Sequence, residues 1–322
     1  MRPFAFLVPA YAAVVGAKNA AYDRGWVKPQ RLSWPVVSVG NLSVGGSGKT
    51  PLVIRLAQLL TGENAAVDVL SRGYGRGDVD QVERVDPGGE AQRFGDEPLL
   101  IARTANVPVY VGASRHEAGL LAERDLPRAG IHLLDDGFQH RKLARDLDIV
   151  VIHATDLDEG LLPAGRLREP LSSLKRAGAI VLRAEDHQLE PELRRRGIVA
   201  PVWIQHRRLA IENVPAAIAF CGIARPDEFF SALRSQNIEL RATLALGDHQ
   251  TYSNSDIQRL LARLHKHKAE CFVTTEKDAV RLTRAQRAQL EKAAPLRIAG
   301  LQVSLEDEPG IVRRLLDIRV RK

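Results

Sequence analysis

Cysteine is nearly absent from this chain of 322 residues, which contains only Cys221 and Cys271. Both lie inside apolar runs, so they predict buried thiols in a reducing compartment and exclude a disulfide framework or a cysteine-based zinc site. The 25 glycines and 17 prolines are too few for a collagen-like, low-complexity or wholly disordered chain. What is present is a globular composition, 45% apolar and 26% charged, and a length that predicts two domains.

Acidic residues are outnumbered by basic ones, 39 to 46, which gives a formal net charge of +7. This excess predicts an anionic partner, which could be nucleic acid, a nucleotide or a membrane surface, and does not choose among them. The excess is concentrated in residues 1–35, where the only acid is Asp23 and the basic residues are Arg2, Lys18, Arg24, Lys28 and Arg31.

Residues 4–17 form an apolar run that is interrupted by Pro9. A helix that crosses a bilayer needs about 20 residues, so this run is too short to span. Basic residues flank it and Tyr11, Tyr22 and Trp26 lie nearby, which predicts a helix in the headgroup region of an anionic leaflet. Two alternatives stay open here: a first helix packed on the core, and a secretory signal with a small-residue cleavage site at residues 15–17.

After Pro35, short Val/Ile/Leu runs alternate with helical stretches, which predicts an α/β protein with a parallel sheet covered on both faces. We expect an N-terminal membrane-associating segment over residues 1–35 and two α/β domains, a larger one over 36–208 and a smaller one over 209–322. An irregular, proline-containing stretch near residues 201–215 is expected to join the two domains. The expected strands are 36–39, 67–70, 109–111, 131–134, 149–152, 179–182, 217–221, 240–246 and 271–274, and the expected helices are 51–60, 115–123, 227–235 and 255–267.

The strongest local signal, SVGGSGKT over residues 43–50, directly follows the first expected strand. Glycines let backbone N–H groups approach a phosphate chain, and a helix N-terminus, a lysine and a hydroxyl for magnesium complete a phosphate cradle. The pattern G-x-x-x-x-G-K-[ST] is met except that Ser43 replaces the first glycine; the alternative is a chance glycine-rich turn. We therefore expect a P-loop NTPase-like parallel-sheet domain with Pro51 as the first helical residue. Its nucleotide-binding residues would be Gly45, Gly46, Ser47, Gly48, Lys49, Thr50 and Pro51.

A second run places two carboxylates, Asp135 and Asp136, at the end of an expected strand, with Gln139 and His140 shortly after them. A P-loop needs a magnesium-binding carboxylate at the end of a neighbouring strand, so Asp135 or Asp136 should face the metal. Two alternatives stay open: a transition-metal site built from His132, Asp135, Asp136 and His140, and an ordinary strand-end turn with solvated aspartates.

Other loops also carry charged side chains. Arg72 or Arg76, in SRGYGRG, could reach a phosphate, bind single-stranded nucleic acid beside Tyr74, or belong to a plain surface turn. Asp96 and Glu97, before Pro98, are typical of a helix N-terminus, and the pair Asp248 and His249 is typical of a solvated turn.

The segment Thr275 to Asp278 predicts a capping box that opens a helix. Its order, Thr-Glu-Lys-Asp, does not match the [NT]-K-x-D motif with which a GTPase reads guanine.

Taken in order, GGSGKTP, SRGYGR, GDEP, DDGFQHR, GDHQTY and TTEKDAVRL resemble the tetraacyldisaccharide 4'-kinase family over residues 1 to about 285. The resemblance implies an enzyme of lipid A biosynthesis that moves the ATP γ-phosphate to the 4'-hydroxyl of an acylated disaccharide 1-phosphate. It implies two α/β domains with the active site in the cleft between them. It also implies a peripheral or monotopic location on the cytoplasmic face of the inner membrane, and a cytosolic ATP site argues against export.

Carried onto matching positions, the resemblance implies that Lys49 and Thr50 hold the ATP phosphates and Mg²⁺. Glu97, Asp136 and Gln139 would complete the metal's surroundings. Asp96 would accept the proton of the sugar hydroxyl, assisted by His249 from the second domain. Arg72, Asp135 and His140 would contact the substrate.

The partners implied are ATP, Mg²⁺, the acylated disaccharide phosphate and an anionic membrane surface, with neither nucleic acid nor an obligate protein partner. A P-loop GTPase or metal-delivery chaperone is the first alternative, but it lacks a guanine motif. A nucleic-acid-binding ATPase is the second, and only the net charge and the SRGYGRG loop favour it.

Overall fold

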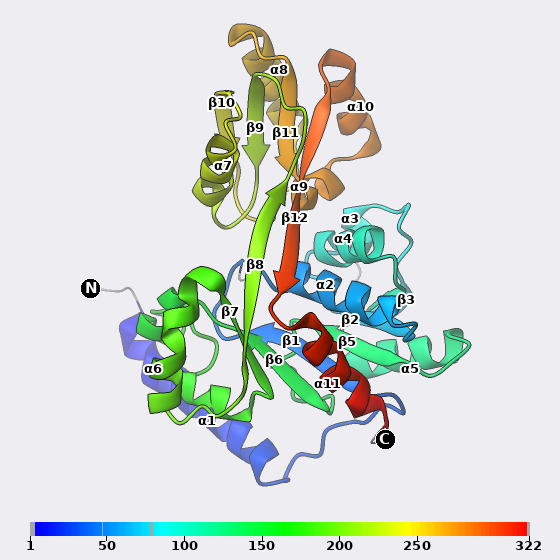
Figure 1. Cartoon of the computed structure of the whole chain (residues 1–322), viewed down its shortest axis with the longest axis vertical. Coiled ribbons are helices and arrows are strands. Elements are labelled where there is room, and N and C mark those ends of the chain that lie inside the picture. Colours follow the sequence, from blue (N-terminus) through cyan, green and yellow to red (C-terminus); the bar gives the residue numbers. More distant parts are fainter. Residues whose placement is uncertain (1–3, 47, 78–79, 321–322) are drawn as a thin grey trace.

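The computed structural model of the protein describes residues 4–46, 48–77 and 80–320. Arg2 and Ser47, both singled out in the sequence, lie outside these residues. One sheet of twelve strands runs through the described chain, in the order β10-β9-β11-β12-β8-β7-β6-β1-β5-β2-β4-β3. Figure 1 shows a larger lower unit and a smaller upper unit on this sheet, joined by the long strands β8 and β12.

The lower unit contains the expected parallel sheet. Its parallel strands are β1 (Val36–Asn41), β2 (Val67–Ser71), β4 (Val109–Val111), β5 (Ile131–Asp135), β6 (Leu147–Val151) and β7 (Ala179–Arg183), and the short β3 (Glu83–Arg84) pairs antiparallel with β4. Alternate residues of each strand face opposite sides, so Val69 packs with the helices of one face and Leu70 with those of the other. Because both faces are covered, these strands carry the continuous apolar runs seen in the sequence.

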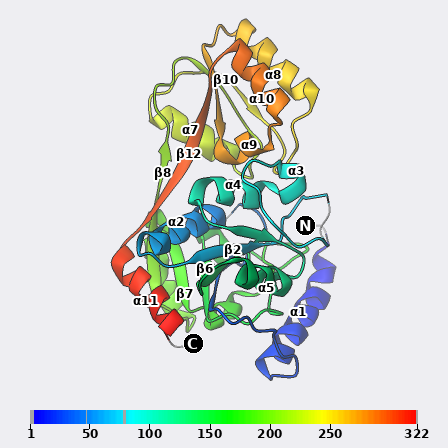
Figure 2. The same ribbon diagram turned by 90° about the vertical axis from the view of Figure 1, so that its right-hand side faces the viewer.

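Helices cover both faces of the lower unit (Figure 2). On one face lie α2 (Lys49–Gly62) and α4 (Asp96–Ala105), preceded by α3 (Ala91–Phe94). On the other lie α5 (Arg115–Asp125), α6 (Glu190–Arg195) and the 3-10 helix η3 (Leu171–Arg176). Two further 3-10 helices, η2 (Ala154–Asp158) and η4 (Ala184–Leu189), follow β6 and β7.

The upper unit is a second α/β layer. Its parallel strands are β9 (Ala217–Cys221), β10 (Leu240–Ala245) and β11 (Cys271–Thr275), and its helices are α7 (Pro226–Ser235), α8 (Asn254–Lys266), α9 (Glu276–Arg281) and α10 (Arg284–Ala293). One apolar cluster lies on each face of this sheet. Cys221 and Cys271 are both fully buried in it, as their apolar surroundings predict.

The prediction of an irregular linker at residues 201–215 is wrong, because residues 202–210 form the strand β8 (Val202–Ala210). Its lower part pairs parallel with β7 and its upper part pairs antiparallel with β12 (Leu296–Leu305). Four polar residues in a row, Gln205 to Arg208, hide the apolar alternation by which a strand is recognised.

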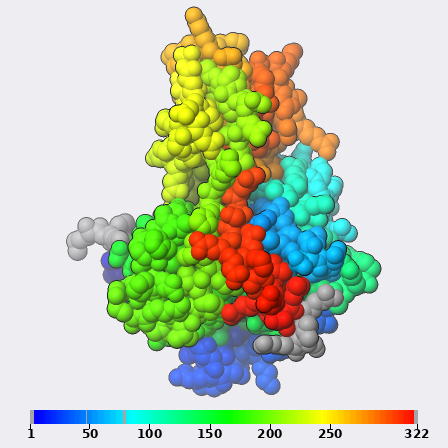
Figure 3. All heavy atoms as spheres, viewed as in Figure 1, coloured from blue at the N-terminus to red at the C-terminus, as the bar shows by residue number. Residues whose placement is uncertain are grey.

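The last helix, α11 (Glu308–Val320), returns to the lower unit. Ile311 and Leu315 are buried in the same cluster as α2, and Arg55 of α2 makes two hydrogen bonds to Glu308. Figure 3 shows this helix, in red, lying on the face of the lower unit. The domain boundary predicted after residue 208 stays a proposal. A smaller domain over residues 209–322 would include α11, although α11 packs on the lower unit.

The N-terminal helix α1 (Val8–Asp23), preceded by η1 (Ala5–Leu7), contains no buried residue. Two hydrogen bonds tie it to the lower unit: the Tyr11 hydroxyl donates to the carbonyl of Arg168, and Asn19 donates to Glu169. Ala12 and Val15 are half-buried, so α1 lies on the surface of the lower unit without adding a side chain to its core, which does not favour the alternative of a first helix packed on the core. Within the described part of the chain, no helix is long and apolar enough to cross a membrane.

Candidate active site

The P-loop connects β1 to α2, as the sequence predicts. Gly45 and Gly48 adopt φ values of 101° and 75°, in the left-handed region that favours glycine. The helix begins at Lys49 with Gly48 as its N-cap, so the expectation that Pro51 is the first helical residue is wrong by two positions. Pro51 still fits, because the first four N–H groups of a helix have no intrahelical acceptor.

Lys49 lies at the centre of a polar cluster that forms at the ends of β1 and β5. Its Nζ donates to Asn41 Oδ1 at 2.9 Å and lies 3.3 Å from Asp136 Oδ1. Arg168 donates to both carboxylate oxygens of Asp136 at 2.9 Å and also contacts Asn41 Oδ1. Thr50 is buried beside them, at the start of α2. The sequence motifs did not point to Asn41 or Arg168, because neither lies within one of them.

The two carboxylates after β5 have different surroundings. Asp135 is buried, and burial together with the charges of Glu97 and Asp136 raises its pKa to about 7. Burial alone would also raise the pKa of Asp136, but Lys49 and Arg168 outweigh it and hold that pKa well below its usual range. Asp136 has a φ of 51°, so the backbone turns sharply between the two side chains.

Two oxygen atoms here have no hydrogen-bond partner among the described residues. Asp135 Oδ1 and Gln139 Oε1 are both buried, whereas Asp135 Oδ2 accepts from Ser71 and Gln139 Nε2 donates to the carbonyl of Asn41. His140 lies nearby and is half-buried; burial and the charge of Arg115 lower its pKa to about 3, so its imidazole is neutral.

The transition-metal alternative is wrong, because His132 lies away from Asp135 at the opposite end of β5. His132 is fully buried, and its Nδ1 lies 2.8 Å from the carboxylate of Asp68 on β2. Over the described ranges, no group of three or more His, Cys, Asp or Glu side chains is placed to hold a metal ion.

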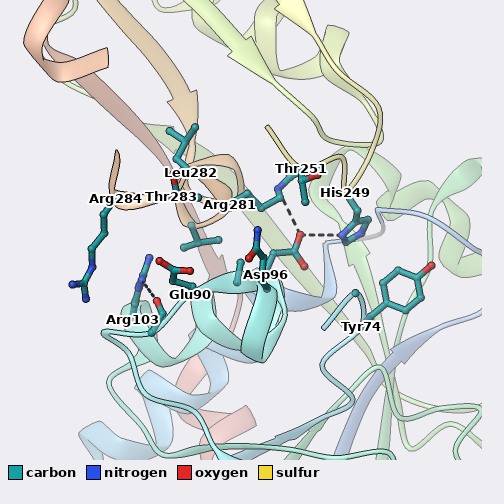
Figure 4. A pocket seen from close by; sticks show the side chains of 15 residues that line it. Tyr74, Glu90, Asp96, Arg103, His249, Thr251, Arg281, Leu282, Thr283 and Arg284 are labelled. Atoms are coloured by element: carbon teal, nitrogen blue, oxygen red, sulfur yellow. Dashed lines mark hydrogen bonds and ion pairs between the residues drawn. The ribbon is translucent and has the colours of Figure 1, made fainter. Parts of the chain in front are cut away.

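The upper unit contributes His249, from the loop after β10, to a contact with Asp96. Asp96 is buried at the N-terminus of α4, and His249 Nδ1 lies 2.9 Å from its Oδ2 (Figure 4). Burial raises the pKa of Asp96, but the hydrogen bond from His249 and the charges of Lys277 and Arg281 outweigh it and lower that pKa. The hydrogen bond to Asp96 raises the pKa of His249, against burial and Lys277.

The helix α9 contributes two cations to the same place. Lys277 Nζ lies 3.1 Å from Glu97 Oε1 and 3.1 Å from His249 Nε2, and Arg281 Nε lies 3.7 Å from Asp96 Oδ2. The capping box predicted for this segment is confirmed in its N-cap half, since the Thr275 side chain accepts from the N–H of Asp278. The Asp278 carboxylate accepts from the Thr275 hydroxyl instead of its N–H. The sequence did not predict a site role for Lys277 or Arg281.

The SRGYGRG loop brings its two arginines to different places. Arg76 is buried and donates to the carbonyl of Gln81, so it supports its own loop. Arg72 is exposed, and its charge adds to burial in lowering the pKa of Arg115 to about 10. Tyr74 lies edge-on to His249, with the ring centroids 5.7 Å apart.

Cationic side chains that the sequence did not single out surround the phosphate cradle. A side chain at Gly45 would collide with the guanidinium of Arg166, and one at Gly48 would collide with that of Arg207 on β8. A side chain at Gly46 would meet Ala224, in the loop after β9. The P-loop therefore faces the upper unit across a short gap lined by arginines.

An open pocket lies between the two units, beside the contact of Asp96 with His249. Asp96 and His249 lie at one end of it and Arg103 and Arg284 at the other, between α4 and the segment that joins α9 to α10 (Figure 4). The geometry thus places an acid and a histidine from different units in contact with each other, at one end of a pocket between the units.

The chain is similar to known proteins along nearly its whole length. The family model described as "Tetraacyldisaccharide-1-P 4'-kinase" matches residues 1–320. A tetraacyldisaccharide 4'-kinase from Koribacter versatilis is 42% identical over 328 residues, covering 97% of each chain. One from Aquifex aeolicus is 36% identical over 297 residues, covering 87% of this chain and 88% of the relative. A crystal structure of LpxK from Aquifex aeolicus in complex with ATP matches with a TM-score of 0.77 and 31% identity, covering 97% of both chains.

Proposed function

Because the chain belongs to the tetraacyldisaccharide 4'-kinase family, we propose how its residues perform that family's reaction. The protein is an ATP-dependent kinase that transfers the γ-phosphate of ATP to the 4'-hydroxyl of a tetraacyldisaccharide 1-phosphate in lipid A biosynthesis. A P-loop GTPase or metal-delivery chaperone is not favoured. The observation that carries the proposed mechanism is the contact between Asp96 and His249, which joins the two units.

The nucleotide is held by the P-loop. Gly45, Gly46 and Gly48 present backbone N–H groups to the phosphates, next to Pro51 in the first turn of α2, and Ser47 is assigned to the same nucleotide site from the sequence. Lys49 neutralises phosphate oxygens as negative charge shifts in the transition state. Its present partners, Asn41 and Asp136, hold the ammonium at the end of β1, where the phosphates arrive.

Mg²⁺, which the family implies, fits the side chains present. Thr50, Glu97, Asp136 and Gln139 supply only oxygen ligands, which this ion prefers. The buried oxygens of Asp135 and Gln139 that have no hydrogen-bond partner in the described chain point to a cation as the missing partner. Mg²⁺ usually takes one or two carboxylates with phosphate and water, so it needs no cluster of three acids. When bound, the ion neutralises and orients the phosphates.

Asp96 acts as the general base. The O–H bond of the 4'-hydroxyl breaks, its proton moves to the Asp96 carboxylate, and the hydroxyl oxygen bonds to the γ-phosphorus while the bond to the ADP oxygen breaks. The lowered pKa keeps Asp96 ionised and ready to accept this proton. His249 orients the carboxylate through its 2.9 Å hydrogen bond.

The acceptor sugar lies between Asp96 and the ends of β2 and β5. Arg72 offers an exposed cation there, and neutral His140 offers a hydrogen-bonding nitrogen without added charge. Asp135, next to the metal's surroundings, accepts a hydrogen bond from the sugar or ligates the ion.

The helix α1 brings the enzyme to its lipid substrate. Phe6 of the preceding η1 is 79% exposed and Val14 of α1 is 69% exposed, while Tyr11 and Asn19 of α1 donate hydrogen bonds to the lower unit. We propose that this apolar surface enters an anionic leaflet at the cytoplasmic face of the inner membrane, as a peripheral or monotopic anchor. A tetraacylated acceptor resides in that leaflet, so enzyme and acceptor meet at its surface.

The base assignment is tested with Asp96→Ala, His249→Ala and the double variant. We expect Asp96→Ala to lower kcat about 100- to 10,000-fold while ATP binding stays nearly intact. His249→Ala should lower kcat less, and the double variant should be no slower than Asp96→Ala, because His249 acts through Asp96. Fully additive losses would show that the two residues act independently, and the paired role would be abandoned.

A further inference from the structure

Lys277 makes a contact that the reaction scheme above does not use. It lies in the first turn of α9, and its ammonium is within 3.1 Å of both Glu97 Oε1 and His249 Nε2. Only 20% of its side chain is exposed. Glu97 belongs to α4 of the lower unit and His249 to the loop after β10, so one ammonium joins three segments.

The chemistry of these groups decides which nitrogen of His249 carries the proton. A lysine ammonium has three N–H donors and no acceptor, so at 3.1 Å it donates to Nε2, which must then be the bare nitrogen. The other nitrogen, Nδ1, therefore carries the hydrogen and donates it to Asp96 Oδ2 at 2.9 Å. The charge of Lys277 also opposes protonation of the ring, against Asp96, and of the two neutral forms the contacts select the Nδ1–H tautomer.

We propose that Lys277 is a positioning residue for phosphoryl transfer, which holds His249 in the Nδ1–H tautomer that orients Asp96. This proposal rests on the role assigned to Asp96 above. With Nε2 occupied by Lys277, the proton taken from the sugar hydroxyl stays on Asp96 and does not pass through the imidazole. His249 then remains a donor to Asp96 throughout the reaction.

The surroundings of His249 show why the lysine is required. Asp248 Oδ1 lies 3.9 Å from Nε2 and is an acid placed to attract a proton to that nitrogen. On its Nδ1 side this histidine faces Asp96, whose Oδ2 Arg281 Nε also approaches at 3.7 Å. Without Lys277, Asp248 would favour protonation at Nε2 and the Nδ1–H tautomer would lose its advantage.

The backbone that presents Lys277 is rigidly held. The next residue, Asp278, is buried and accepts from the N–H of Gly222 at 2.7 Å and from the Tyr252 hydroxyl at 2.7 Å. The Thr275 side chain caps the same turn. Because the backbone of this turn is fixed, the Lys277 side chain starts from a fixed point, which a residue that positions another side chain requires.

The direct test is the ¹⁵N NMR spectrum of the imidazoles in the full-length protein labelled at histidine. The signal of His249 is assigned as the one that disappears in His249→Ala. In the wild type we expect a protonated Nδ1 and a bare Nε2; in Lys277→Met we expect a protonated Nε2. Lys292→Met removes the same charge from an exposed position on α10 and should leave the spectrum unchanged. The same nitrogen pattern in the wild type and Lys277→Met would overturn the proposal.

Kinetics then separate positioning from structural support. Lys277→Met should lower kcat about 10- to 100-fold with little change in the KM for ATP. The lysine contacts His249, which orients the general base Asp96, and does not contact the P-loop. In a His249→Ala background the same substitution should have almost no further effect. An undiminished effect there would place the role of Lys277 at Glu97 alone and overturn the proposal.

Chemical rescue provides a readout that a merely structural role would not move. Both native cysteines are fully buried, so in a Lys277→Cys variant the introduced thiol is the accessible one and can be alkylated with 2-bromoethylamine. This restores an ammonium at nearly the length of lysine, and we expect kcat and the imidazole pattern to recover together. If His249→Ala has wild-type kcat, the assigned dyad fails; the NMR comparison still decides the tautomer by itself.

Discussion

Asp135 and Asp136 are neighbours in the chain and still differ widely in acidity. The left-handed backbone at Asp136 turns its carboxylate toward Lys49 and Arg168, while Asp135 remains buried beside Glu97. Burial and negative neighbours raise the pKa of Asp135 to about 7, and two cations hold the pKa of Asp136 well below its usual range. Adjacent carboxyls with such different environments are characteristic of sites where each has its own role.

The substitution Lys49→Ala tests the assignment of residues 43–50 as a P-loop. We expect kcat/KM to fall about 1,000-fold or more, because the ammonium acts most strongly on the charge that develops in the transition state. The fold should persist, since Arg168 still pairs with Asp136 and Asn41. Turnover is measured with an acylated disaccharide phosphate, beside the exposed-lysine control Lys292→Ala. Near wild-type turnover in the folded variant would rule out the P-loop assignment.

At the scale of single elements, the N-terminal helices and the strands β2 and β5 each depart from the usual distribution of polar and apolar residues. The N-terminal helices η1 and α1 leave Phe6 and Val14 exposed to solvent, while Tyr11 and Asn19 of α1 donate hydrogen bonds to the lower unit. Within the strands β2 and β5, whose carboxyl ends carry Ser71 and Asp135, the polar pair Asp68 and His132 interrupts the apolar runs, and the register places the two side by side. Both features are local departures from the usual pattern, and each has a measurable consequence.

Acidic substitutions on η1 and α1 test membrane association. The double variant Phe6→Asp, Val14→Asp should bind anionic vesicles at least about tenfold more weakly, because apolar contact and attraction to the headgroups are both lost. ATP binding should be unchanged, since neither side chain contacts the P-loop. A matched control adds two acids at the exposed Ala285 and Ala288 of α10, far from α1 in Figure 1. Equal weakening in both variants, in vesicle sedimentation, would mean that net charge alone governs binding.

The pair of Asp68 and His132 makes stability depend on pH. Burial alone would lower the pKa of His132, but Asp68 and Glu123 outweigh it and raise that pKa. A histidine whose pKa is higher in the folded than in the unfolded state stabilises the fold fully below about pH 6.5, and this contribution is lost as pH rises through the folded value.

The variant Asp68→Asn should remove most of this dependence. In urea unfolding between about pH 6 and pH 9, the wild type should lose stability as pH rises above 6.5, and Asp68→Asn should lack this part of the slope. At the acid end of the range the variant should be the less stable protein, because it has lost a buried ion pair. Parallel pH profiles for the two proteins would contradict the assignment.

At the scale of the whole molecule, the strands β8 and β12 run through both units, and the helix α11 follows β12 back to the lower unit. The strand β12 pairs with β11 in the upper unit and with β8 below, so the backbone hydrogen bonding is continuous from one unit to the other. The helix α11 then fills part of the lower core with Ile311 and Leu315. Movement of the two units relative to each other therefore requires bending of β8 and β12.

Leu315→Ala tests where α11 belongs. Leu315 is fully buried with α2, so its truncation should cost about 2–5 kcal/mol of the free energy of unfolding. Hydrogen exchange should rise in α2 and not in α8. Leu290→Ala, equally buried between α10 and the upper sheet, is the matched control and should loosen α8 instead. Faster exchange in the upper unit alone after Leu315→Ala would assign residues 209–322 to one folding unit.

By itself the sequence determined the features that depend on neighbours along the chain. The apolar runs predicted the strands of both units other than β3, β8 and β12, Thr275 with Asp278 predicted a cap, and SVGGSGKT predicted the turn between β1 and α2. These are set by side-chain periodicity, glycine conformations and hydrogen bonds over a few residues, so they can be recognised without a tertiary structure. Where polar residues hid the periodicity, as in β8, the prediction failed.

The tertiary structure decided which side chains meet. Arg168 reaches Asn41 from 127 residues away, and Lys277 reaches Glu97 from 180 residues away. Such contacts depend on the order of strands in the sheet and on the packing of the two units, and neither residue lies in a pattern that names its partner. The sequence could point to Asp96 and His249 as a pair only through family resemblance; the fold brings them within 2.9 Å because the loop after β10 meets the N-terminus of α4.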